Sequence, residues 1–251
     1  MLTRERKDHI LTILRRDRRL VAKDVAGELG LSEDTIRRDL RELAAEGLLQ
    51  RVHGGALPAA PAMAGYAERT ALSPEGKAAI GRAAAALVQP GQVVILDGGT
   101  SALQVARHFA ADLRATVITH SPSVAVALAE HPLIEIELIG GRLYKHSLVA
   151  MGAVAAGMIA GIRADLYFMG ASGIHPELGC TTGDAEEAAI KRLLSGHAAE
   201  TVLLASAEKL GAAAPFRVMG LAEVTTMIVE ASVPAETLRP YLTAGPAIIR
   251  A

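Results

Sequence analysis

The chain has 251 residues, a formal net charge of −1 at pH 7 and 51% hydrophobic residues. This length suits one large or two ordinary domains and allows a sizeable core. A single cysteine excludes an intrachain disulfide and fits a reducing cytoplasm. The low aromatic content, 3%, argues against stacking platforms for single-stranded nucleic acid or RNA.

Four further classes are excluded: secreted, membrane-spanning, metal-binding and repeat proteins. No signal peptide precedes the charged N-terminus, and the most apolar run, residues 148–162, is too short to span a bilayer. The eight histidines and the cysteine form no cluster with metal-ligand spacing, so no metal and no cofactor are expected. No repeat of the period found in repeat proteins is present.

Two short helices are predicted first, over residues 4–16 and 21–29, with Thr3 as the N-cap of the first. The turn at residues 29–32 is short, as a helix-turn-helix requires. The inward faces of the two helices are Ile10, Ile13 and Leu14, and Val25, Ala26 and Leu29.

The third helix carries the most informative pattern. Gly30 ends the preceding helix, because a residue without Cβ accepts the left-handed conformation, and Ser32 caps the next. Ile36, Leu40 and Leu43 recur at i, i+4 and i+7 and predict a buried stripe. A polar face opposite that stripe on a short helix suits the DNA major groove.

A wing is predicted after this helix, with a strand over residues 48–52 and a turn at Gly54-Gly55. Arg38 and Arg41 are expected to point away from the buried stripe, with Thr35 and Arg37 on its flanks. The alternative interpretation is a solvated helix face. The predicted DNA-binding residues are Ser32, Glu33, Thr35, Arg37, Arg38, Arg41, Arg51 and His53.

Charge is distributed unevenly along the chain. Residues 1–57 carry a net charge of +2 (twelve basic against ten acidic residues), and the remainder carries −3. A DNA-binding domain with so small a net positive charge must concentrate its basic side chains at one place on its surface. Four arginines crowd the end of the first helix, where they either contact phosphates or complement the helix dipole. They are Arg15, Arg16, Arg18 and Arg19.

The segments Thr35-Ile-Arg-Arg-Asp-Leu40 and Arg51-Val-His-Gly-Gly-Ala56 resemble the two N-terminal signatures of DeoR-type bacterial transcription regulators. The resemblance extends from about Arg4 to the C-terminus. It implies a small N-terminal winged helix-turn-helix, a larger sensor domain and operator DNA as a partner.

Residues 58–72 are predicted to be a linker between a DNA-binding domain, residues 1–57, and an effector-sensing domain, residues 73–251. Two prolines and a glycine fall within eight residues there. From residue 73 onward short apolar strands alternate with helices, which predicts an open, mainly parallel α/β sheet covered on both faces. The predicted strands are 93–96, 116–119, 134–139, 166–169, 202–205 and 226–229, and the predicted helices are 78–88, 100–109, 124–130 and 186–194.

Small and hydroxyl residues follow several of these strands, at 97–101, 119–121, 140–141 and 170–173. In an open α/β sheet the ligand crevice lies at the carboxyl ends of the strands, and N–H groups at a helix start attract anions. Ordinary βα turns are the alternative for any one loop. Together they predict a site for a small phosphorylated or polyhydroxylated metabolite, in one cavity about the size of a sugar phosphate.

The second half resembles the DeoR-type sensor domain, which is similar in fold to ribose-5-phosphate isomerase and glucosamine-phosphate deaminase. The resemblance implies a phosphorylated sugar as effector. Residues 97–101 match the family's phosphate loop, with Gly98 and Ser101 replacing Ser and Thr, and Lys191 falls on a family lysine. The predicted effector-binding residues are Lys77, Asp97, Gly98, Gly99, Thr100, Ser101, His120, Ser121, Gly140, Gly141, Arg142, Gly170, Glu187 and Lys209.

Several of these residues have a second interpretation. Lys77 is either a ligand contact or a surface ammonium, Arg142 either a ligand clamp or a surface residue, and His120, which replaces an Asn of the family, either a ligand contact or a hydrogen-bonded structural residue. Ser206 and Glu230 stand where most relatives carry Asp.

Two functions compete: an effector-controlled DNA-binding regulator, and a sugar-phosphate isomerase-like enzyme with an added DNA-binding domain. The isomerases carry Asp-Gly-Ala-Asp after one strand, whereas this chain has Met169-Gly-Ala-Ser172, so the carboxylate base is missing. The expected function is therefore a transcriptional regulator and not an enzyme. The resemblance favours a repressor that forms a homo-oligomer, a dimer or higher, in the cytoplasm and without membrane contact.

Overall fold

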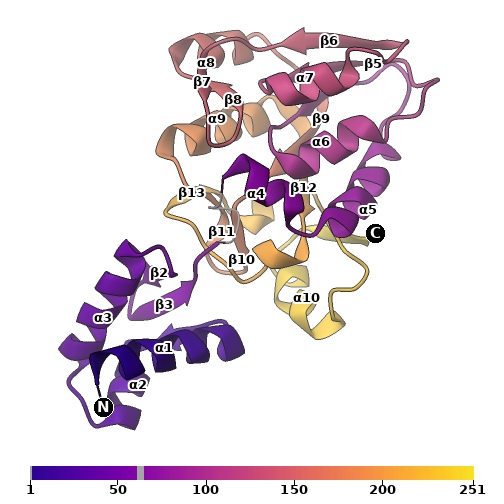
Figure 1. Cartoon of the computed structure of the whole chain (residues 1–251). Coiled ribbons are helices and arrows are strands. Elements are labelled where there is room, and N and C mark those ends of the chain that lie inside the picture. Colours follow the sequence, from indigo (N-terminus) through magenta and orange to yellow (C-terminus); the bar gives the residue numbers. More distant parts are fainter. Residues whose placement is uncertain (1, 61–64) are drawn as a thin grey trace.

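A computed structural model describes residues 2–60 and 65–251, and Figure 1 shows a small N-terminal part beside a larger α/β part. In the N-terminal part three helices precede a β-hairpin, which is the predicted winged helix-turn-helix. Its elements are α1 (Thr3–Asp17), β1 (Leu20–Val21), α2 (Ala22–Leu29), α3 (Glu33–Ala45), β2 (Leu49–Val52) and β3 (Gly55–Pro58).

Local rules explain most of this part. Gly30 has φ of 63° at the end of α2, and Ser32 Oγ accepts a hydrogen bond of 3.3 Å from Thr35 N. Ile36 and Leu40 are buried on the predicted stripe, in a core that the three helices share with the small antiparallel sheet β1-β3-β2.

Three local predictions were wrong. Thr3 lies inside α1 and Leu2 is the N-cap, because the backbone N–H of Leu2 is bonded by Glu5. Val21 belongs to β1, where it pairs with Gly55, and does not start α2. The turn of the wing falls at residues 53–54, and Gly55 is the first residue of β3, where a Cβ would collide with the Leu20 carbonyl oxygen.

The larger part alternates strands and helices as predicted. It begins with α4 (Tyr66–Ala71), a helix with no buried residue inside the segment expected as linker. The following elements are α5 (Pro74–Ala85), β4 (Val93–Leu96), α6 (Thr100–Arg107), β5 (Ala115–Thr119), α7 (Pro122–Leu128), β6 (Ile134–Leu138), β7 (Arg142–Tyr144), β8 (Val149–Met151), α8 (Ala153–Ile159), β9 (Ala164–Gly170), β10 (Gly173–His175), β11 (Gly179–Thr182), α9 (Ala185–Gly196), β12 (Ala198–Ala205), η2 (Ala207–Lys209), β13 (Phe216–Met219), η3 (Leu221–Glu223), β14 (Thr226–Val229), α10 (Ala235–Leu242) and β15 (Ala247–Arg250).

The central sheet has the order β15-β14-β12-β9-β4-β5-β6, and all its strand pairs are parallel. The chain builds β4, β5 and β6 toward one edge and then returns to place β9 on the other side of β4. This reversal makes the carboxyl ends of β4 and β9 the switch point of the sheet, where α/β folds bind their ligands.

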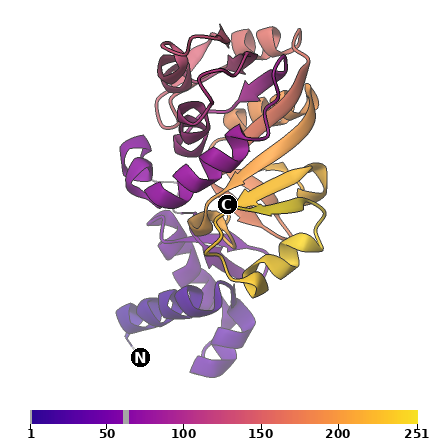
Figure 2. The ribbon, with the colours of Figure 1, turned by 90° about the vertical axis from the view of Figure 1, so that its right-hand side faces the viewer.

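Alternating strand residues bury both faces of the sheet. Leu96 and Phe168 pack with α5, α6 and α7 on one face, and Ile95 and Tyr167 face the opposite core, which includes residues of α8, α9 and α10. Figure 2 shows the C-terminal strands and α10 in the same view as the N-terminal part. No helix of the described residues is long and apolar enough to cross a membrane.

Candidate functional site

Helix α3 presents an exposed basic face, as predicted. Arg38 and Arg41 are exposed, and Arg37 pairs with Glu33 one turn earlier at 2.8 Å. Beside this helix the wing forms a groove of about 270 Å³, whose wall includes Arg37, Arg51 and His53. A short helix and a β-hairpin that carry basic side chains around one groove suit a DNA duplex.

A buried ion pair fixes α3, and sequence reasoning missed it. The carboxylate of Asp39 is fully buried and bonds the guanidinium of Arg6 in α1, with Arg6 Nη2 to Asp39 Oδ1 at 3.0 Å. Buried charges in proteins are normally paired. The signal in the sequence is an acid next to Leu40 on the inward side of the helix, which demands a partner.

The candidate effector cavity lies at the switch point of the sheet. Loops after β4 and β9, the start of α6, helix α9 and the η2 segment all contribute to its wall. Its free volume is about 30 Å³, which is room for one or two water molecules and less than the predicted sugar phosphate. The lining residues are Arg69, Leu72, Lys77, Gly98, Gly99, Thr100, Ser101, Ser147, Gly170, Ala171, Ser172, Thr182, Glu187, Lys191, Glu208 and Lys209.

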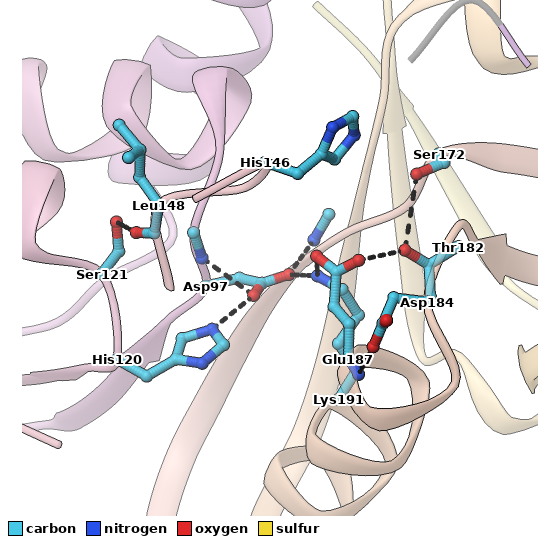
Figure 3. Close-up of polar contacts among 12 residues, drawn as sticks. Asp97, His120, Ser121, His146, Leu148, Ser172, Thr182, Asp184, Glu187 and Lys191 are labelled. Atoms are coloured by element: carbon cyan, nitrogen blue, oxygen red, sulfur yellow. Dashed lines mark hydrogen bonds and ion pairs between the residues drawn. The ribbon is translucent and has the colours of Figure 1, made fainter. Parts of the chain in front are cut away.

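Asp97 is the centre of a polar network next to the cavity, and Figure 3 shows its contacts. Its carboxylate accepts hydrogen bonds from Gly98 N at 2.8 Å and Gly170 N at 2.7 Å, so it ties the loops after β4 and β9 together. It also contacts Lys191 and His120. Burial opposes ionisation of Asp97, but these two partners more than offset it and hold its pKa well below the ordinary value.

Lys209 is the cavity lysine best placed for an added anion. Its Nζ donates to Ser101 Oγ and to the Leu204 carbonyl, both at 3.3 Å, and no carboxylate of the described residues lies within ion-pair distance. Burial therefore lowers the pKa of Lys209 to about 8, with Glu208 opposing the shift. By contrast, Asp97 and Glu187 overcome the burial of Lys191 and raise its pKa.

Lys77 is buried, and its ammonium closes the end of α4. It donates to the carbonyls of Arg69, at 2.6 Å, and Leu72, and lies 3.7 Å from Glu208. Burial lowers its pKa, and Glu208 partly offsets this. The surface-ammonium interpretation is wrong for Lys77, because its side chain is only 3% exposed.

Arg69 and Glu208 were not predicted, yet both line the cavity. Arg69 reaches it from α4, where its Nη2 donates to the His146 carbonyl at 2.7 Å. Within the described residues, Arg69 Nε and Glu208 Oε2 are buried without a hydrogen-bond partner. A charged residue just before the first sensor helix was the available signal for Arg69.

Six predicted residues lie off the cavity wall, and Asp97, described above, is one of them. His120 is fully buried and forms a hydrogen bond with Asp97, so the interpretation as a structural residue holds for it. Ser121 Oγ donates to the Leu148 carbonyl. Gly140, Gly141 and Arg142 follow β6, an edge strand separated from β9 by β5 and β4, and exposed Arg142 pairs with Glu186. Across residues 2–60 and 65–251, no group of His, Cys, Asp and Glu side chains forms a metal site.

A winged helix-turn-helix joined to an α/β domain with a cationic cavity defines a ligand-sensing DNA-binding protein. Residues 6–60 match the DeoR-like helix-turn-helix domain, and residues 72–231 match the DeoR C-terminal sensor domain. The chain therefore belongs to the DeoR family of transcriptional regulators and is not an enzyme.

Two curated relatives span nearly the same length. The chain is 33% identical to the HTH-type transcriptional regulator GlpR of Haloferax volcanii, over 99% of this chain and 98% of the relative. It is 33% identical to the HTH-type transcriptional repressor GlcR of Bacillus subtilis, over 92% of this chain and 89% of the relative. Among solved structures, ribose 5-phosphate isomerase A of Methanocaldococcus jannaschii matches 53% of this chain and 52% of its own, with 16% identity and a TM-score of 0.39.

Proposed function

We propose that this regulator is a repressor whose effector is a phosphorylated sugar or a related polyhydroxylated phosphate, bound in the cavity at the switch point. The observation that carries the proposal is that cationic side chains and the amino end of α6 line the same cavity. Lys209, Lys191 and Arg69 line the same cavity as Thr100 and Ser101. An anion placed there is attracted by the positive side chains and accepts hydrogen bonds from the backbone N–H groups.

The first turn of α6 supplies those donors. Leu103 N makes the first intrahelical bond, to the Gly99 carbonyl, so the N–H groups of residues 100–102 precede the ladder. Gly99 has φ of 95°, a conformation that side chains rarely adopt. Hydroxyls of Ser172 and Thr182, which also line the cavity, suit the hydroxyl groups of a sugar.

Communication with the DNA-binding part runs through the residue after Lys209. Arg18, the C-cap residue of α1, donates a hydrogen bond of 2.8 Å from Nη2 to the carbonyl of Leu210. A second contact between the two parts is the ion pair of Arg19 and Glu177, at 3.7 Å. We expect an anion on Lys209 to shift η2 and so change this contact. Regulation requires that the effector binds the two states with different affinity.

DNA recognition is assigned to α3 and the wing, with residues 1–57 as the DNA-binding domain, 58–72 as the connection and 73–251 as the sensor. The separate core of the first part supports this division. We expect a homo-oligomer, a dimer or higher, because paired reading helices match half-sites one helical turn or a multiple apart. The protein should act in the cytoplasm, where operator DNA is found.

The test combines ligand binding with DNA release. The full chain is screened by thermal shift against inorganic phosphate, sugar phosphates, sugar alcohol phosphates and the same compounds without phosphate. A duplex selected from a random pool then reports DNA affinity by fluorescence anisotropy.

Phosphorylated compounds should raise the melting temperature and release the duplex. Lys209→Met should remove both effects, whereas Lys145→Met, at an exposed position away from the cavity wall, should keep them. Equal stabilisation by unphosphorylated sugars would refute the anion site, and tighter DNA binding with effector would refute the assignment as a repressor relieved by its ligand.

A further inference from the structure

Glu208 differs from the other carboxylates around the cavity. Asp97 has partners on both oxygens, and Glu187 accepts from Thr182 and lies 3.9 Å from Lys191. In Glu208 only Oε1 is engaged, by Ser206 Oγ at 2.7 Å and by Lys77 at 3.7 Å. Its Oε2 is buried with no hydrogen-bond partner in the described part of the chain.

A buried carboxylate oxygen without a partner is costly, so it favours any ligand that brings a donor. An ionised carboxylate only accepts hydrogen bonds, so the donor must be a hydroxyl or an amine of the effector. Because like charges repel, Glu208 also disfavours a second anionic group, such as a carboxylate, at this place.

Arg69 has the complementary group, a buried donor. Its Nε is a buried donor without a partner among the described residues, and it lines the same cavity. Among the described side chains, the wall therefore presents an unfilled donor on Arg69 and an unfilled acceptor on Glu208. A ligand that fills both carries an anionic or carbonyl oxygen for Arg69 and a hydroxyl for Glu208.

Ser206 acts through Glu208. Its side chain is fully buried and does not line the cavity, but its hydroxyl fixes Oε1. The serine therefore holds the carboxylate of Glu208, two residues later in the chain, in place.

We propose that Glu208 determines effector specificity by accepting a hydroxyl of the bound compound, which restricts the effector to polyhydroxy phosphates without a second anionic group. This inference rests on the proposed function, because it assigns the part of the effector that lies away from the phosphate. Ser206 is a positioning residue in this scheme.

The test measures binding of matched pairs by calorimetry with the full chain. Each pair differs in one anionic group: glycerol 3-phosphate and 3-phosphoglycerate, ribose 5-phosphate and 5-phosphoribonate, glucose 6-phosphate and 6-phosphogluconate. Inorganic phosphate reports the anion site alone. The proteins are the wild type, Glu208→Gln, Ser206→Ala, and Glu130→Gln as a control at an exposed acid away from the cavity wall.

The wild type and the control should prefer the member of a pair without the carboxylate by at least about tenfold, because Glu208 accepts a charge-assisted hydrogen bond from its hydroxyl and repels the carboxylate. Glu208→Gln should reduce this preference about tenfold, and Ser206→Ala should reduce it partly. Melting curves confirm that each variant is folded.

Two results overturn the inference alone: a preference that survives in Glu208→Gln, or a wild type that binds no hydroxylated compound better than inorganic phosphate. A wild type that binds no compound of the panel, inorganic phosphate included, refutes the proposed function and this inference together.

Discussion

Raising the pH from 7 to 9 should weaken binding of a phosphate monoester about tenfold. The cause is Lys209, whose pKa burial lowers to about 8. A group with that pKa is about 90% protonated at pH 7 and about 10% at pH 9. A phosphate monoester is already dianionic across this range, because its second pKa is about 6. The loss therefore comes from the protein and equals the ratio of the protonated fractions.

The assay is calorimetry with glycerol 3-phosphate at pH 7, 8 and 9, on the wild type and on Lys209→Arg. A guanidinium stays protonated throughout this pH range, so the arginine variant should hold its affinity within about twofold. A wild type that binds equally well at pH 7 and 9 would refute the reasoning. So would an arginine variant that weakens as much as the wild type.

Stability without ligand should respond in the opposite direction. In the folded state the pKa of Lys209 lies below its ordinary value of 10.5, so between about 8 and 10.5 the unfolded chain binds more protons. Lys209 therefore costs stability below pH 8, and this cost is relieved as the pH rises toward 10.5. Alkaline pH should therefore weaken ligand binding without further lowering the stability of the folded protein through this buried ammonium.

Four substitutions test the remaining assignments. Arg38→Ala should remove about 1–3 kcal/mol of specific DNA binding in a mobility-shift titration without lowering the melting temperature, because the side chain is exposed. Gly99→Val should abolish phosphate binding by calorimetry and spare DNA binding, because its φ of 95° strains any side chain at the start of α6. Asp39→Ala should destabilise the DNA-binding part by about 3–5 kcal/mol in denaturant titrations, since it leaves the buried guanidinium of Arg6 unpaired. Arg18→Ala should leave both binding affinities intact but reduce the effect of effector on DNA affinity, because it removes the contact to the Leu210 carbonyl.

Each of these has a clear contrary result. Wild-type DNA affinity in Arg38→Ala would remove α3 as the reading helix, and Arg107→Ala, an exposed arginine of the sensor, is the control. Normal phosphate affinity in Gly99→Val would take the β4 loop out of the site. Unchanged stability in Asp39→Ala would mean that water replaces the ion pair, and full regulation in Arg18→Ala would place the communication elsewhere.

Local patterns predicted much of the fold. The stripe of Ile36, Leu40 and Leu43 and the short apolar strands are encoded within a few residues, so periodicity finds them. The β4 and β9 loops were found for the same reason, because glycines directly follow apolar runs.

What the sequence did not reveal depends on strand order and distant partners. Residues 140–142 follow a strand as the other loops do, but β6 takes the edge position, so its end does not reach the switch point. Asp39 forms its ion pair with Arg6, which lies thirty-three residues away in the sequence. Arg69 comes from a six-residue helix with no buried residue, which leaves no periodic signal. These features are fixed by long-range packing, which no short window of sequence contains.

The small cavity has a kinetic consequence. With about 30 Å³ of free space, a sugar-sized compound enters only after part of the wall has moved, and we expect α4, none of whose residues is buried, to be the part that moves. At high ligand concentration the association rate should then level off at the rate of this opening, well below the diffusion limit. Above that concentration, the protein itself sets the delay between the arrival of the effector and the release of DNA.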